Sequence, residues 1–278
     1  MNQKKIPPPP SAHVLQMFDV HEVPTPLHGG EGNTFRAGNI VLKPALQIEL
    51  VEKCAAVLST ITEDGFRVNR PVRTIDGKWT CEGWQAFYFL EGVHVKGRWK
   101  EKIDISIKFH RALQKFPLSD FIAEGNSPWE VADRVVWNGT VEEYGEKVRP
   151  ITDRLLAVKT NIDIPSQLIH GDMTGNILFH ETLSPAIIDF SPYIRPAAYA
   201  TAIIVVDAVV WEGAQMALLS EMENTHLNNQ LLIRAALWRI RTTDEFSRRN
   251  QSDPTSEVTP YSHFVDGLLR RIASEQSA

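Results

Sequence analysis

The segment LIHGDMTGNILFHETLSPAIIDFSPYIRP, residues 168–196, decides how the rest of the chain is interpreted. The apolar pair Leu168-Ile169 enters a polar loop that ends at Asn176, and an apolar run follows directly. After a turn-rich break, a second apolar run leads to Asp189. Short apolar runs bounded by turn residues are typical of strands. The segment therefore predicts two strands that form a hairpin.

Polar groups stand at the ends of these two strands. If the strands pair antiparallel, Asn176 begins one and Asp189 ends its neighbour, so the two side chains come together. Asp172 lies on the loop that leads in. Mg²⁺ prefers oxygen ligands and is usually held by one or two protein groups while phosphates and water complete its shell. The segment therefore predicts a magnesium-nucleotide site.

The motif HGDMTGN, followed by IIDF, resembles the catalytic and metal motifs of the aminoglycoside phosphotransferase and choline kinase group, relatives of the protein kinases. In that group HGD replaces the HRD of protein kinases, and an IDF or IDW Asp replaces the DFG Asp. The resemblance implies that Asp172 is the catalytic base and that Asn176 and Asp189 hold Mg²⁺. It is strongest to a bacterial branch of the group, and it does not identify the acceptor.

The spacing within the motif departs from the family. The catalytic Asp and the Asn are usually five steps apart, whereas Asp172 and Asn176 are four apart. The short loop leaves an alternative open, a pseudokinase or nucleotide-binding module without transferase activity. A purely structural turn at His-Gly-Asp is a further alternative, although it gives no reason for the whole set of polar residues.

A glycine-rich turn precedes a strand lysine near the start of the chain. The sequence GGEGN contains Gly29, Gly30, Gly32 and Asn33, and Lys43 ends the strand IVLK that follows. Glycines let backbone N–H groups approach a phosphate closely. The pattern resembles the N-terminal lobe of the phosphotransferases, which implies that the loop covers the phosphates of ATP and that Lys43 contacts them.

Residues 45–61 have apolar side chains at steps of three and four, which predicts a helix. In the kinase template a glutamate on this helix pairs with the strand lysine. Glu49 and Glu52 are the candidates, and we expect Glu52 to pair with Lys43.

Residues 66–72 and 79–91 have strand-like composition and flank an Asp-Gly turn, which is a hairpin signal. The second stretch ends with Phe89 and Leu90 before Glu91-Gly92. By its order it matches the strand that becomes the hinge between the lobes. The resemblance implies that backbone groups at Phe89 and Leu90 bind adenine.

A strand-rich first third followed by helices predicts an α+β fold with segregated layers. The resemblance implies a bilobal protein-kinase-like fold. We expect a disordered leader over residues 1–13, an N-lobe over 14–91 and a C-lobe over 92–278.

Composition limits the remaining classes of function. A net charge of −5 gives no basic footprint for nucleic acid. No run is long enough to span a membrane, and the opening segment has no apolar core of a signal peptide. Cys54 and Cys81 are far apart and suggest neither zinc nor a disulfide framework, which favours a reducing cytoplasm.

The expected function is transfer of the γ-phosphoryl group of ATP, with Mg²⁺, to a hydroxyl of a small molecule. We expect the acceptor pocket among the helices after Pro196, where Asp207 and Glu212 could meet a cation. The sequence predicts neither the acceptor nor the oligomeric state.

Overall fold

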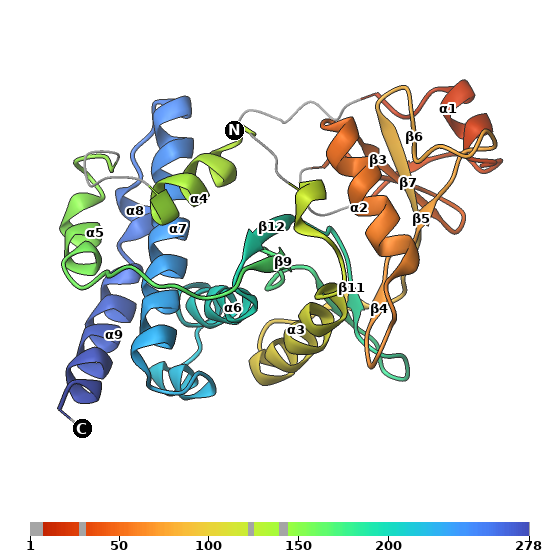
Figure 1. The fold of residues 1–278 in the computed structure, drawn as a ribbon. Coiled ribbons are helices and arrows are strands. Elements are labelled where there is room, and N and C mark those ends of the chain that lie inside the picture. The colour runs from red at the N-terminus through yellow and green to blue at the C-terminus, as the bar shows by residue number, and fades with distance from the viewer. Residues whose placement is uncertain (1–7, 28–31, 122–124, 139–143, 278) are drawn as a thin grey trace.

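The structure is a computed structural model that describes residues 8–27, 32–121, 125–138 and 144–277. Strands fill the first third and helices most of the remainder, so the two parts form an N-lobe and a C-lobe (Figure 1). The α+β arrangement expected from the sequence is therefore present. The first helix, α1 (Ala12–Met17), begins inside the expected leader because the Ser11 hydroxyl caps it by accepting from the Val14 N–H.

The N-lobe is built on an antiparallel sheet with strand order β1-β2-β3-β7-β5, and β6 pairs with β7. Its strands are β1 (Thr25–Pro26), β2 (Phe35–Ala37), β3 (Ile40–Pro44), β5 (Pro71–Val72), β6 (Thr80–Cys81) and β7 (Trp84–Tyr88). Residues 79–91 have strand-like composition, but Glu82 and Gly83 both have positive φ and divide the stretch into β6 and β7. Two such residues in succession make the tight turn of a two-residue hairpin. Helix α2 (Ile48–Thr60) packs beside this sheet, against β5 and β6.

A second sheet of four strands lies where the lobes meet, in the order β4-β11-β10-β8. Its strands are β4 (Arg67–Val68), β8 (Val93–His94), β10 (Ile177–Phe179) and β11 (Ala186–Ile187). β10 and β11 form the expected antiparallel hairpin, with Ile177 opposite Ile187. β4 belongs to the N-lobe in sequence, yet it pairs parallel with β11 of the C-lobe. Hydrogen bonds therefore cross the boundary that the sequence predicts near residue 91.

Helices make up most of the C-lobe, together with the two-stranded sheet β9-β12 (Figure 1). The helices are α3 (Trp99–Leu113), α4 (Pro128–Asn138), α5 (Arg149–Leu156), α6 (Ala197–Trp211), α7 (His226–Asn250), α8 (Thr255–Val258) and α9 (Tyr261–Glu275). The short helices are η1 (Leu118–Phe121) and η3 (Met216–Glu221), and the strands are β9 (Gln167–His170) and β12 (Pro192–Arg195).

Helix α6 is the centre of this lobe. Most of its residues are buried, and it packs against α3, α7 and α9. A helix that is apolar on every side is expected to be enclosed. Within the part of the chain that the structure describes, no helix has both the length and the apolar character needed to cross a membrane.

Candidate functional site

Two cavities meet at the loop between β9 and β10. The first, which we call the interlobe cleft, has a volume of about 390 Å³ and is lined by Lys43, Phe89, Leu90, Asn176 and Asp189, among others. The second, which we call the helical pocket, has about 410 Å³ and is lined by Asp172, Asn176, Trp211, Arg239 and Tyr261, among others. Gly175 and Asn176 line both cavities. The loop is therefore the wall between two spaces of small-molecule size.

The β10–β11 hairpin brings Asn176 and Asp189 to the same end, as the sequence predicts. The Ile188 N–H donates to the Asn176 carbonyl at 3.0 Å, which closes the hairpin next to both side chains. Asp189 has φ of 53°, in the left-handed region that residues with a side chain rarely adopt. Its carboxylate is half exposed to the interlobe cleft. Strained backbone of this kind is characteristic of functional sites.

Lys43 reaches across the cleft to Asp189. The distance from Lys43 Nζ to Asp189 Oδ1 is 2.6 Å. The expected ion pair between Lys43 and Glu52 is wrong, because Glu52 instead accepts a hydrogen bond from the Thr80 hydroxyl at 3.2 Å. Glu49, the other candidate, is exposed at the start of α2.

The register of α2 explains this error. On this helix the Cys54 thiol has its pKa raised to about 12 by burial, although the charge of Lys43 acts to lower it. Leu50 and Cys54 are four residues apart and both pack on the core, with Leu58 four residues further. Residues two apart on a helix point in nearly opposite directions, so Glu52 lies off this face.

Asp172 sits on the loop, and both of its carboxylate oxygens accept hydrogen bonds. Oδ1 accepts from Arg239 Nη2 at 2.8 Å, while Asn176 Nδ2 donates to the Asp172 carbonyl at 2.6 Å and to Oδ2 at 3.3 Å. The short loop therefore still brings Asp172 and Asn176 into contact. Burial acts to raise the pKa of Asp172, but Arg239 outweighs it and holds the pKa below its usual value. The carboxylate remains 45% exposed.

Arg239 was not predicted from the sequence, and it connects three segments. Its guanidinium lies on α7 and binds both Asp172 and Asp207, with the Nε to Asp207 Oδ1 distance at 2.8 Å. Asp207, on α6, also accepts from the Thr174 hydroxyl at 2.8 Å. Its side chain is 7% exposed. The sequence left open whether Asp207 meets a cation or is an ordinary polar position, and the structure shows it buried and paired within the chain.

Glu212 is also paired within the chain. Its carboxylate accepts from Lys102 Nζ at 2.9 Å and from Trp99 Nε1 at 2.7 Å. Lys102 is buried, and the N–H of Gly97 donates to the same carboxylate at 3.2 Å. The sequence left open whether Glu212 meets a cation or is an ordinary polar position, and the structure shows it paired with a lysine of the chain itself.

Two buried histidines hold the β9–β10 loop in place through hydrogen bonds. His170 Nδ1 accepts from the backbone N–H groups of Asp172 and Ser191, and its Nε2 faces the Ile188 carbonyl at 3.2 Å. His110 Nε2 in turn accepts from the His170 N–H at 3.0 Å. Since that nitrogen accepts, Nδ1 carries the proton and donates to the Ser106 carbonyl at 2.7 Å. Burial lowers the pKa of His110 to about 3 and lowers that of His170, so both rings are neutral near pH 7.

Of the remaining predicted residues, the structure places two, Phe89 and Leu90, at the interlobe cleft. Phe89 and Leu90 line it directly after β7 ends. Gly29 and Gly30 lie outside the described residues. Gly32 is exposed with φ of +75°, as a turn glycine requires, and neither it nor Asn33 is among the cleft's lining residues.

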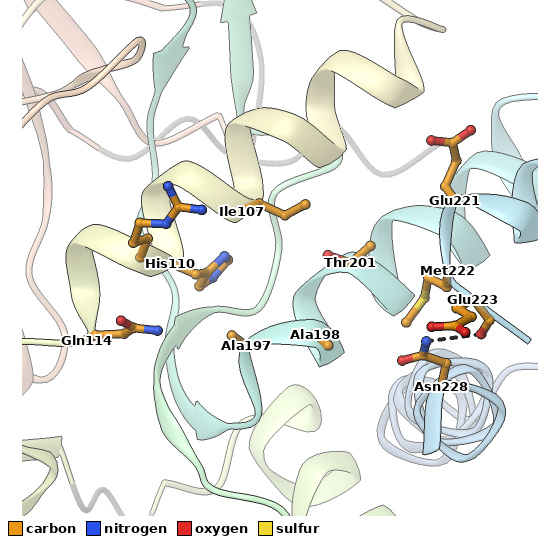
Figure 2. Close-up of a pocket in the computed structure, with 11 residues that line it drawn as sticks. Ile107, His110, Gln114, Ala197, Ala198, Thr201, Glu221, Met222, Glu223 and Asn228 are labelled. Atoms are coloured by element: carbon orange, nitrogen blue, oxygen red, sulfur yellow. Dashed lines mark hydrogen bonds between the residues drawn. The ribbon is translucent and has the colours of Figure 1, made fainter. Parts of the chain in front are cut away.

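A separate groove of about 380 Å³ lies between α3 and the beginning of α6, and it is also lined by Met222 and Asn228 (Figure 2). Figure 2 shows Ile107, His110 and Gln114 projecting from α3 toward it, opposite Thr201 of α6. Of the described residues predicted to bind nucleotide or metal or to act as base, none lines this groove. His110 connects it to the loop, because the same side chain accepts from His170.

Comparisons with known proteins bear on the fold. No family model matches the sequence, and no curated protein matches it. The chain is similar in structure to the aminoglycoside phosphotransferase of Alicyclobacillus acidocaldarius, with a TM-score of 0.62 and 13% identity over 99% of this chain and 98% of that one. It is similar to the aminoglycoside phosphotransferase APH(4)-Ia, with a TM-score of 0.62 and 12% identity over 93% of this chain and 97% of that one.

A third similar structure is the spectinomycin phosphotransferase APH(9)-Ia in complex with ADP and spectinomycin. Its TM-score is 0.56 and its identity 16%, over 93% of this chain and 96% of that one. At such identities the likeness establishes the fold. The chain has the bilobal, protein-kinase-like fold of the aminoglycoside phosphotransferases, as its motifs imply.

Proposed function

We propose that this protein transfers the γ-phosphoryl group of ATP to a hydroxyl of a small molecule. The observation that carries the proposal is the position of the β9–β10 loop between two cavities. Asp189 and Lys43 face the interlobe cleft, Asp172 faces the helical pocket, and Asn176 lines both. A phosphoryl group passing from one bound molecule to another needs this juxtaposition, since catalysis of this reaction is mainly positioning and electrostatic stabilisation.

The interlobe cleft has the chemistry that a nucleotide requires. Its lining includes apolar Val41, Leu178 and Ile188, which would enclose a flat base, and Lys43 provides a positive charge for phosphates. Phe89 and Leu90 would border the base, and the glycine turn would cover the phosphates. Similar structures hold ADP with spectinomycin, or AMP-PNP with hygromycin B.

The end of the hairpin fits Mg²⁺. Asn176 uses its amide nitrogen toward Asp172, and its amide oxygen accepts no hydrogen bond from the described residues. Asp189 adds a half-exposed carboxylate. An oxygen-only donor set with few protein groups suits Mg²⁺. When bound there, Mg²⁺ supplies positive charge that offsets the charge of the phosphates.

The chain's own groups then perform the transfer. Lys43 holds the phosphates, and Asp172 orients the acceptor hydroxyl and accepts its proton. The acceptor oxygen forms a bond to the γ-phosphorus as the bond to the β–γ bridging oxygen breaks, and ADP leaves. The lowered pKa of Asp172 keeps the carboxylate ionised near pH 7, so it can accept a hydrogen bond from the acceptor hydroxyl. The free thiols Cys54 and Cys81 and the use of ATP fit a cytoplasmic setting.

The test is Asp172→Ala, measured for ATP affinity, melting temperature and ADP release on one sample. The proposal expects ATP affinity within a few-fold of wild type and a fall in transfer of about 10²–10⁴-fold. A pseudokinase would show ATP binding without transfer by either protein. Wild-type transfer by a variant that binds ATP and melts normally would remove Asp172 from the mechanism.

A further inference from the structure

The helical pocket contains three carboxylates, and each is already occupied by the chain. Asp207 is bound by Arg239 and Thr174, and Glu212 is bound by Lys102. One carboxylate oxygen of Asp172, Oδ1, accepts a hydrogen bond from Arg239. Removing a basic partner from a buried carboxylate is costly, because an uncompensated charge is left behind. A cation entering this pocket would therefore find no free carboxylate except the base itself.

Arg239 adds a repulsive element. Its guanidinium lines the pocket and is 16% exposed. A cationic group placed next to Asp172 would also lie next to this permanent positive charge. Like charges brought together in a partly desolvated cavity disfavour binding, and such repulsion is a common source of specificity.

Aromatic side chains also line the pocket. The Trp211 side chain lies at the end of α6 and is 47% exposed. Its position is fixed, because its Nε1 donates to the buried Tyr261 hydroxyl at 3.1 Å and the two rings meet edge to face. Phe246 lines the same cavity from α7. A rigid exposed ring beside a few polar groups offers a surface on which a flat or apolar face of a ligand can stack.

We infer that the acceptor is a hydroxylated ring compound without net positive charge, a sugar or nucleoside in chemical class, whose apolar face stacks on Trp211. This rests on the proposed function for the identity of the pocket. It differs from the expectation of a cationic substrate, because Asp207 and Glu212 are neutralised inside the chain. Asp172 and Asn176 then meet the reacting hydroxyl, while Thr243 lies on the same wall as Arg239.

The experiment uses matched pairs of acceptors that differ in one charge. Glucose and ribonucleosides are compared with glucosamine and the corresponding amino-nucleosides, and kanamycin and hygromycin B serve as polycations. Binding is measured by calorimetry in the presence of magnesium and AMP-PNP, and transfer by ADP release with magnesium and ATP. We expect the best neutral member to bind at least about tenfold more tightly than its amino analogue, which corresponds to about 1.4 kcal/mol.

Trp211→Ala tests the stacking surface. We expect it to weaken binding of the preferred neutral compound about tenfold while leaving AMP-PNP affinity unchanged, because Trp211 does not line the interlobe cleft. Ile75→Ala is the matched control, since Ile75 is an exposed apolar residue of the N-lobe. Trp211→Phe should recover most of the affinity, which separates loss of stacking from a folding defect.

The outcomes separate this inference from the proposed function. Trp211-dependent binding of a neutral compound without ADP release would support the inference and contradict the transferase. Tighter binding or faster transfer of the cationic member of the pairs would overturn the inference and leave the transferase standing. Failure of every neutral compound to bind would also overturn it.

Discussion

The Nζ of Lys43 lies 2.6 Å from Oδ1 of Asp189, so an ion pair joins a strand of the N-lobe to the end of the C-lobe hairpin at which we propose that Mg²⁺ binds. The Asp189 carboxylate is 51% exposed. Exposed ion pairs contribute only about 0–1 kcal/mol to stability. The pair therefore matters for the positions of the two side chains in the cleft more than for the stability of the fold.

Asp189→Asn tests this position. We expect magnesium-dependent ATP affinity to fall by more than about tenfold, about 1.4 kcal/mol, because a carboxylate facing both Lys43 and the metal is lost. The melting temperature should change little. Calorimetric titration of ATP with and without magnesium measures the effect. Asp266→Asn is the control, since it removes a similarly exposed partner of Arg154 far from the cleft. Unchanged magnesium dependence would exclude Asp189 from the metal site.

Arg239→Gln should lower the stability of the fold and change the pKa of Asp172, the proposed base. Asp207 would remain buried without its basic partner, so we expect the free energy of unfolding to fall by about 3–5 kcal/mol. Replacing both partners, as Arg239→Met with Asp207→Leu, should recover most of this loss. Arg154→Gln, in an exposed pair, should change the free energy of unfolding by no more than about 0.5 kcal/mol.

Arg239→Gln should also change the pH at which Asp172 titrates. Arg239 holds the pKa of Asp172 low, so its removal should raise that pKa, and the base should lose its charge at a higher pH than in the wild type. Carboxyl ¹³C NMR of Asp172, compared with Asp172→Asn for assignment, measures the shift directly. An unmoved titration would show that Arg239 does not tune the base.

Stability should fall as the pH drops below about 6.5. The pKa of His110 is about 3 in the folded protein, against about 6.5 in an unfolded chain. Between these values the unfolded chain binds a proton that the folded protein does not, so stability is complete above pH 6.5 and declines by about 1.4 kcal/mol per pH unit below it. His170, whose pKa burial also lowers, contributes in the same direction.

Urea unfolding between pH 5 and 7 measures this slope. His110→Gln should reduce the slope of stability against pH by the contribution of about one proton. His263→Gln, at an exposed position on α9, should leave the slope unchanged. An identical slope in His110→Gln and wild type would contradict the assignment of the lowered pKa to this residue.

Gly171 and Gly175 form a matched pair within the loop. A Cβ at Gly171 would lie 2.4 Å from the Tyr193 ring, whereas a Cβ at Gly175 would enter open space. We expect Gly171→Ala to lower the free energy of unfolding by about 1–3 kcal/mol, as overpacking does, and Gly175→Ala to be neutral or slightly stabilising. Equal stability of the two variants in urea would show that Tyr193 moves aside without cost.

The hairpin was predictable from the sequence because its determinants are local. Asn176 and Asp189 flank two apolar runs joined by a turn, so pairing alone brings them together. Arg239 was not predictable in the same way, since 67 residues separate it from Asp172. A signal does exist, because an arginine between Trp238 and Ile240 interrupts an apolar helical segment and must have a buried partner.

The error at Glu52 has a different cause. Periodicity located helix α2 but did not decide which face meets the sheet. The apolar steps Leu50, Cys54 and Leu58 mark that face and leave Glu52 to one side, so the kinase template was applied in the wrong register. No carboxylate of α2 pairs with Lys43, and Asp189 forms the ion pair with Lys43 instead.

The parallel pairing of β4 with β11 limits how the two lobes can move. The Arg67 N–H donates to the Pro185 carbonyl, and the Asn69 N–H donates to the Ile187 carbonyl, two residues before Asp189. If the N-lobe swings outward, either this ladder breaks or β11 is carried along and Asp189 with it. With the ladder intact, opening the cleft would therefore also displace the carboxylate that we propose holds Mg²⁺.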